Sequence, residues 1–202
     1  MRIARTRLFV GSILVALLVS VIGGWLLSRS SSSNDVDAKL TGDLAGGVQD
    51  PTIGTNAPVQ GTPFPSVSLT EASSGDVVPI VVSGRPAVVN FWYSTCEPCR
   101  REMPVLARSA QDFAGQVDFI GINPLDSSQE ALDFAARYNV TYPIYLDPDG
   151  TLIAAAGVGT MPVTLFVDAN GVIVKQHGGE IDYSTLNATI EEAFGVREGV
   201  QS

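Results

Sequence analysis

The chain has 202 residues, enough for one ordinary domain with appendages, and carries a net charge of −9 from 12 basic and 21 acidic residues. Four of the basic residues lie before position 30 and no acidic residue precedes Asp35, so the rest of the chain is more acidic than the whole. An acidic body repels phosphate groups and anionic lipid headgroups, which excludes nucleic acid as an expected partner and argues against a basic membrane-binding face.

Residues 8–27 form a run of twenty residues without a charge, preceded by three arginines and followed by one. Twenty residues at helical rise span about 30 Å, the thickness of a bilayer core, so the run predicts a transmembrane anchor rather than a cleaved signal peptide with its shorter core. The arginine excess predicts a single-pass protein of the cell membrane, with residues 1–7 in the cytoplasm and everything after Arg29 outside. Residues 28–57, rich in Ser, Gly, Asp and Thr, predict a flexible linker.

The folded domain is expected over residues 58–195, followed by a tail at 196–202. Alternating β-rich runs and helical patterns, closed by a hairpin and a helix, predict an α/β sandwich around a mixed sheet. The expected elements are a β-hairpin of 67–69 and 77–82, a buried strand over 87–93, a helix over 97–113, a strand over 117–122, a helix beginning near 126, a strand over 143–146, a short helix over 151–156, a hairpin of 163–167 and 172–174, and a last helix containing 186–194.

The only two cysteines, Cys96 and Cys99, stand between the expected buried strand and the helix that follows it. A CxxC closes too short a loop to stabilise a fold, so the spacing favours a redox dithiol over a structural bridge. Zinc would need further ligands, and the only histidine, His177, is distant in sequence, so neither a metal nor another cofactor is expected. Free N–H groups and the dipole at a helix N-terminus lower a thiol pKa, which predicts Cys96 as the nucleophile and Cys99 as the resolving residue.

Glu102 lies three residues after Cys99, on the same face of the expected helix. A carboxyl group there could exchange a proton with Cys99 or change the thiol pKa values through its charge, whereas the simpler interpretation is a solvated helix glutamate. Both interpretations are open from these residues alone.

The stretch Asn90-Phe91-Trp92 before the CxxC, and Met161-Pro162-Val163-Thr164 before a later strand, resemble the thioredoxin superfamily over about residues 58–195. The N-terminal hairpin, an inserted β-α unit and a glutamate three residues after Cys-Glu-Pro-Cys are similar to the membrane-anchored TlpA/ResA/DsbE-like branch. The resemblance implies a thioredoxin-like sandwich and a thiol–disulfide oxidoreductase.

The resemblance also implies roles for site residues. Glu102 would tune the titration of the cysteines, the peptide bond before Pro162 would be cis and face the Cys96–Cys99 disulfide, and Met161 would offer its backbone to substrate. Two further residues, Trp92 and Thr95, are expected to contact substrate. Thr95 departs from the family, which usually has an aromatic residue before the first cysteine.

Proteins of this branch sit outside the cytoplasmic membrane, and the resemblance implies that the dithiol reduces the CxxCH disulfide of apocytochrome c with electrons from a membrane donor of the CcdA type. The departure at Thr95 leaves a second function open, that of a general thiol oxidase or isomerase for exported proteins. A third hypothesis is a non-catalytic metal-binding module, for which His177, Met103 and Met161 would be a poor ligand set.

Overall fold

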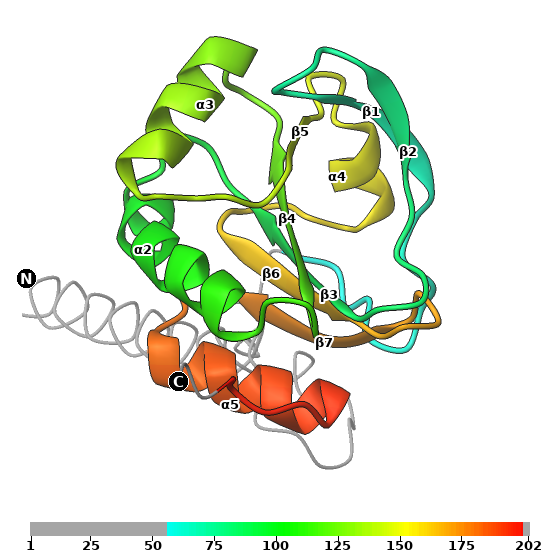
Figure 1. The fold of residues 1–202 in the computed structure, drawn as a ribbon. Helices are drawn as coiled ribbons and strands as arrows, with labels where there is room; N and C mark the ends of the chain where they lie inside the picture. The colour runs from blue at the N-terminus through cyan, green and yellow to red at the C-terminus, as the bar shows by residue number, and fades with distance from the viewer. Residues whose placement is uncertain (1–55, 200–202) are drawn as a thin grey trace, which may run out of the picture. The chain divides into compact units, whose positions relative to one another are not determined.

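The computed structural model describes residues 56–199, in which seven strands form one mixed sheet with helices on both faces (Figure 1). The strands are β1 (Val67–Glu71), β2 (Val77–Ile80), β3 (Ala87–Phe91), β4 (Asp118–Asn123), β5 (Ile144–Leu146), β6 (Val163–Val167) and β7 (Ile173–Gly178). The helices are α2 (Glu97–Asp112), α3 (Ser128–Arg137), α4 (Thr151–Ala155) and α5 (Tyr183–Phe194). The predicted α/β sandwich with its N-terminal hairpin is confirmed.

The predicted anchor at 8–27 and most of the predicted linker lie outside the described residues. Between positions 56 and 199, none of the helices has the length and hydropathy needed to cross a bilayer.

The strand order is β2-β1-β5-β4-β3-β6-β7, so β3 lies inside the sheet, parallel to β4 and antiparallel to β6. All five residues of β3 are buried, as a strand covered on both faces requires. The strand ends at Phe91, two residues earlier than predicted, because the chain turns there toward the cysteines.

Successive residues of β3 face two different apolar layers. Val88 packs with Leu106 of α2 and Leu186 of α5, whereas Val89 packs with Leu152 of α4 on the other side. The amino-terminal half of α2 and the helix α3 share a third apolar cluster, which contains both cysteines. The CxxC therefore lies where α2, α3 and the end of β3 meet.

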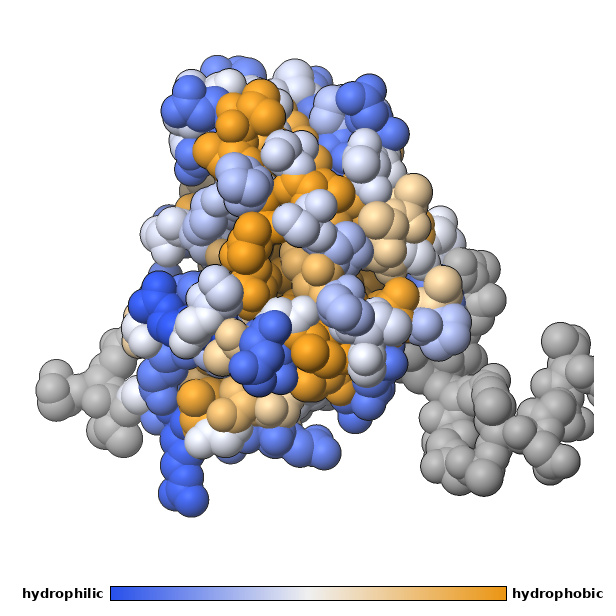
Figure 2. All heavy atoms as spheres, turned by 90° about the vertical axis from the view of Figure 1, so that its right-hand side faces the viewer, coloured by the Kyte–Doolittle hydropathy of each residue, from blue (hydrophilic) through white to orange (hydrophobic). Residues whose placement is uncertain are grey.

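One edge of the sheet is β2, on the face seen in Figure 2, where apolar side chains are visible at the surface. Val77 and Val81 are 69% and 59% exposed there. Pro79 lies between them in β2 and has no N–H, so this edge cannot offer a continuous row of donors to an added strand.

The other edge, β7, ends four residues beyond the predicted 172–174, at Gly178, because Lys175, Gln176 and His177 pair with β6 despite their polarity. Its outer side is accompanied by residues 57–64, with hydrogen bonds such as Gly61 N–H to Ile173 O at 2.7 Å. Residues on both sides of the predicted domain start at 58 are thus hydrogen-bonded to the sheet.

Candidate active site

Cys96 and Cys99 form a disulfide with a Cα–Cα distance of 5.2 Å. Cys96 is the N-cap residue of α2, and the backbone N–H of Cys99 donates to its Sγ at 3.3 Å. Cys96 is 4% exposed and Cys99 is fully buried. The outer sulfur can therefore be attacked or attack a substrate, and the inner sulfur can reach only its partner.

Charges on the first turn of α2 largely compensate each other. The exposed carboxylate of Glu97, between the cysteines, lies 3.7 Å from both Arg100 and Arg101. These ion pairs weaken the electrostatic repulsion that the Glu97 carboxylate alone would exert on a Cys96 thiolate. The helix N-terminus and the Cys99 N–H remain as the local features that favour the thiolate form.

The Met161–Pro162 peptide bond is cis, as the resemblance implied. Pro162 is buried, Met161 is half-buried, and the Met161 carbonyl oxygen lies 3.9 Å from Cys96 Sγ. The loop before β6 therefore brings a backbone carbonyl to the outer sulfur across a sequence separation of 65 residues.

The turn before Cys96 is attached to the turn after β4 through Asp126. Its carboxylate accepts from the Ser94 N–H at 2.7 Å, from the Ser94 hydroxyl at 2.8 Å and from the Asn123 side-chain amide at 2.7 Å. The N-cap of α3 is Ser127, with Glu130 completing a capping box. Asp126 therefore does not cap the helix, and its carboxylate can bind Ser94 instead. The sequence pattern indicates Asp126 only as part of a helix start, and nothing in it predicts the connection to Ser94.

Glu102 is fully buried, which excludes the solvated-glutamate interpretation. Its carboxylate accepts from the Asn90 side-chain amide at 2.8 Å and from the Ile181 N–H at 3.2 Å. Burial raises the pKa of the Glu102 carboxyl to about 8, with a smaller contribution from the charge of Glu180, although both hydrogen bonds favour the ionised form. The group can thus gain or lose a proton near neutral pH.

Asn90 and Thr164 complete the surroundings of this carboxyl, and sequence analysis did not identify them as site residues. They are paired across β3 and β6, and the Asn90 amide donates to Thr164 Oγ1 at 3.1 Å. Asn90 interrupts an otherwise apolar strand. That interruption was the available signal, because a polar side chain in a doubly covered strand needs a buried partner.

The two other residues expected to contact substrate occupy different environments. Thr95 is exposed beside Cys96, where a docked molecule can reach it. Trp92 is fully buried and stacks on Phe134 with ring centroids 5.2 Å apart. The expectation that Trp92 contacts substrate conflicts with this burial: the indole ring packs in the apolar cluster that contains the cysteines and supports them from inside.

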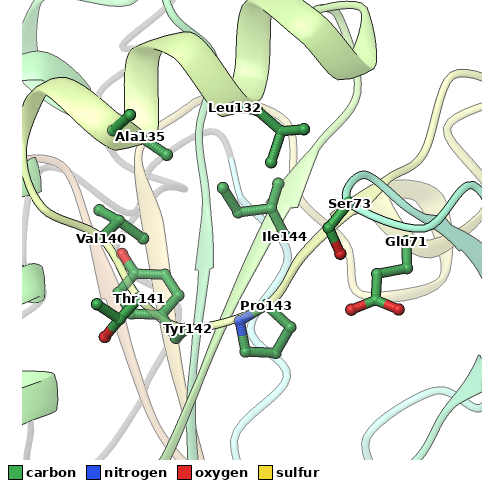
Figure 3. A pocket seen from close by; sticks show the side chains of 10 residues that line it. Glu71, Ser73, Leu132, Ala135, Val140, Thr141, Tyr142, Pro143 and Ile144 are labelled. Atoms are coloured by element: carbon green, nitrogen blue, oxygen red, sulfur yellow. The ribbon is translucent and has the colours of Figure 1, made fainter.

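A pocket of about 530 Å³ lies between α3, the loop before β5 and the turn after β1 (Figure 3). Its lining includes Leu132, Ala135, Val140 and Ile144, with Glu71 as its one carboxylate. Neither cysteine lines it. Ala135 and Ile144 also pack in the cluster that contains the disulfide, so the pocket adjoins that cluster and adds no cysteine to the site.

Comparisons with known proteins agree with this arrangement. A model of the AhpC/TSA family matches residues 60–176, more than half of the chain. The chain belongs to the AhpC/TSA family.

Two curated relatives of the chain are named for disulfide chemistry. Thiol-disulfide oxidoreductase ResA of Bacillus subtilis is 27% identical over 129 residues, covering 63% of this chain and 72% of that protein. Thiol:disulfide interchange protein DsbE of Pseudomonas fluorescens is 37% identical over 124 residues, covering 60% of this chain and 68% of that protein.

The fold has a similar counterpart among solved structures. A DsbE-like protein described as a putative thiol:disulfide interchange protein from Chlorobium tepidum superimposes with a TM-score of 0.61 at 26% identity, covering 68% of this chain and 99% of that one. These similarities, together with the Cys96–Cys99 pair, identify a thioredoxin-like thiol–disulfide oxidoreductase of the ResA/DsbE type.

Proposed function

We propose that this protein is a membrane-anchored, extracytoplasmic reductant that reduces the disulfide of apocytochrome c during cytochrome c maturation and receives its electrons from a membrane donor of the CcdA type. The observation that carries the proposal is the buried Glu102 carboxyl on the helix face of Cys99, with a pKa near 8. Similarity to ResA over 72% of that protein supports the same assignment.

The reaction begins when the Cys96 thiolate attacks one sulfur of the substrate disulfide. A mixed disulfide forms and the first substrate thiolate leaves. Cys99 then loses its proton, which a Glu102 carboxylate can take up, and attacks Cys96 Sγ. The second substrate thiolate leaves, two electrons have passed to the substrate, and the Cys96–Cys99 disulfide seen in the structure is the product.

Burial supports this order of attack. Cys99 is enclosed in the apolar cluster, so it cannot contact a protein substrate directly, and it is held one helical turn from Cys96. An enclosed resolving thiol with a titratable carboxyl nearby can be deprotonated at the moment when the mixed disulfide must be released.

The reduction potential of the Cys96–Cys99 couple tests the proposal. A dedicated reductant requires a potential at least as reducing as that of the glutaredoxins, about −200 to −230 mV, or of thioredoxin, about −270 mV. Equilibration with a glutathione or dithiothreitol buffer, followed by thiol labelling, measures it. A value near that of DsbA, about −120 mV, would refute the reductant assignment.

A second candidate is a general thiol oxidase or isomerase for exported proteins. The exposed Thr95 favours it, because the position before the outer cysteine carries a small polar residue instead of the aromatic side chain usual in the family, which leaves room for unfolded chains of varied sequence. Refolding of a reduced, unfolded test protein discriminates between the two: an oxidase forms disulfides in it, and a dedicated reductase does not.

The metal-binding hypothesis has no supporting observation. Among residues 56–199, no three His, Cys, Asp or Glu side chains come together as they would at a metal site. Stoichiometric copper binding by the reduced protein would nevertheless reopen it.

A further inference from the structure

Asn56 is a buried polar residue, 6% exposed, whose carboxamide is directed at a loop 103 residues away in sequence. Its oxygen accepts from the Gly159 N–H at 2.6 Å and from the Thr160 N–H at 2.9 Å. Its amide nitrogen donates to Thr160 Oγ1 at 3.4 Å. One side chain therefore binds two successive backbone N–H groups and a hydroxyl of the same loop.

The loop that Asn56 binds leads directly into the substrate-facing part of the site. Residues 157–162 contain no helix or strand, so regular backbone pairing does not define their conformation. Thr160 is followed by Met161, whose carbonyl oxygen lies 3.9 Å from Cys96 Sγ. A shift of Thr160 would therefore move the carbonyl that faces the reactive sulfur.

The segment that carries Asn56 is itself held firmly. The Ala57 N–H donates to Gly157 O at 2.8 Å, and the Gln176 side chain bonds both the Ala57 carbonyl and the Val59 N–H at 3.2 Å. Gly157 has a φ of +64°, and a Cβ there would lie 2.6 Å from Ala57 Cβ, so the close approach of the two segments requires glycine. We call residues 56–59 the entry strap.

We propose that Asn56 is a positioning residue for disulfide exchange: it holds residues 159–160 so that the Met161 backbone can bind an extended segment of a protein substrate beside Cys96. The inference rests on the proposed exchange function and deepens it. An extended chain offers backbone N–H groups to the Met161 carbonyl. A small disulfide has no such backbone and needs only access to Cys96.

Steady-state reduction by the full-length protein, with dithiothreitol returning the Cys96–Cys99 disulfide to the dithiol after each turnover, tests this role with two substrates, a peptide disulfide in an extended chain and a small organic disulfide. Asn56→Ala is expected to raise KM for the peptide by about five- to tenfold, the effect of losing a docking interaction worth up to a factor of ten. Its rate with the small disulfide should stay within about twofold of wild type, because attack by Cys96 is unchanged.

Two variants separate positioning from general stability. Asn56→Asp keeps an oxygen that can accept from Gly159 and Thr160, so it should restore the peptide KM to within about twofold of wild type. Gln176→Ala removes the two hydrogen bonds to Ala57 and Val59 but leaves the Asn56 contacts. It should therefore lower the melting temperature without a loss of activity that is specific to the peptide substrate. If Asn56→Ala does not fold, Asn56→Ser can replace it, because the shorter side chain cannot span both N–H groups. This variant should also show a raised KM for the peptide and an unchanged rate with the small disulfide.

Equal loss with both substrates, or no change with either, would overturn the positioning role. A Gln176→Ala variant that shows the same peptide-specific loss would also overturn it, because strap stability would then explain the effect. A wild-type protein that exchanges neither disulfide would instead overturn the proposed function.

Discussion

Replacing Glu102 by Gln tests the buried carboxyl through the pH dependence of stability. Burial raises the Glu102 pKa from an ordinary value of 4.5 to about 8. The folded protein therefore retains a proton that the unfolded chain releases above about pH 4.5. This contribution to stability is fully present below that pH and is lost as the pH rises through about 8.

The magnitude follows from the size of the shift. One proton difference changes the free energy of unfolding by about 1.4 kcal/mol per pH unit, so the oxidised wild-type protein should lose about 3 kcal/mol between about pH 5 and pH 8. Carboxyls with lowered pKa values, such as those of Asp182 and Glu130, have finished titrating below that window. Urea unfolding of the oxidised protein at several pH values measures the loss, because disulfide-bonded cysteines do not titrate.

Glu102→Gln should remove most of this pH dependence while the fold is kept. The glutamine oxygen can accept from the Ile181 N–H. Its amide can donate to Asn90 Oδ1, a buried atom without a partner in the wild type, once the Asn90 carboxamide turns over so that its oxygen faces position 102. Glu97→Gln is the matched control, since that side chain is 72% exposed on the same helix and should leave the wild-type slope unchanged. A Glu102→Gln variant that still lost about 3 kcal/mol over this range would refute the reasoning.

Three further outcomes are expected. In the reduced protein, Glu102→Gln should lower the apparent pKa of the dithiol, because a neighbouring carboxylate opposes a second negative charge; an unchanged ultraviolet thiolate titration would contradict this. Cys99→Ser should accumulate a mixed disulfide through Cys96, visible by mass spectrometry, and equal trapping by Cys96→Ser would reverse the assigned roles. Asp126→Ala should lower the free energy of unfolding by about 1–3 kcal/mol and slow exchange, since the Ser94 donors lose their acceptor; an unchanged urea midpoint and rate would count against that connection.

The sequence was sufficient for the elements and for the reactive pair because these depend on local pattern. The apolar run over β3, the proline in the first turn of α2 and the CxxC spacing are each readable within a few residues. The β1–β2 hairpin and the β6 strand were likewise predicted from neighbouring residues. The length of β7 was underestimated because its polar residues are strand-forming only through their pairing with β6.

The sequence by itself determined the chemistry of this protein: two cysteines at the start of a helix make a dithiol, and Glu102 must share a face with Cys99 because helical spacing requires it. Only the tertiary structure decided whether that carboxyl is buried and how the loop beside Cys96 is held. Packing between elements buries the Glu102 carboxyl, and this burial raises its pKa; the two hydrogen bonds that it accepts come from Asn90 in β3 and from Ile181, 79 residues beyond Glu102 in the chain. The loop beside Cys96 likewise depends on Asn56, because hydrogen bonds across 103 residues arise from packing and leave no periodic signal in the sequence.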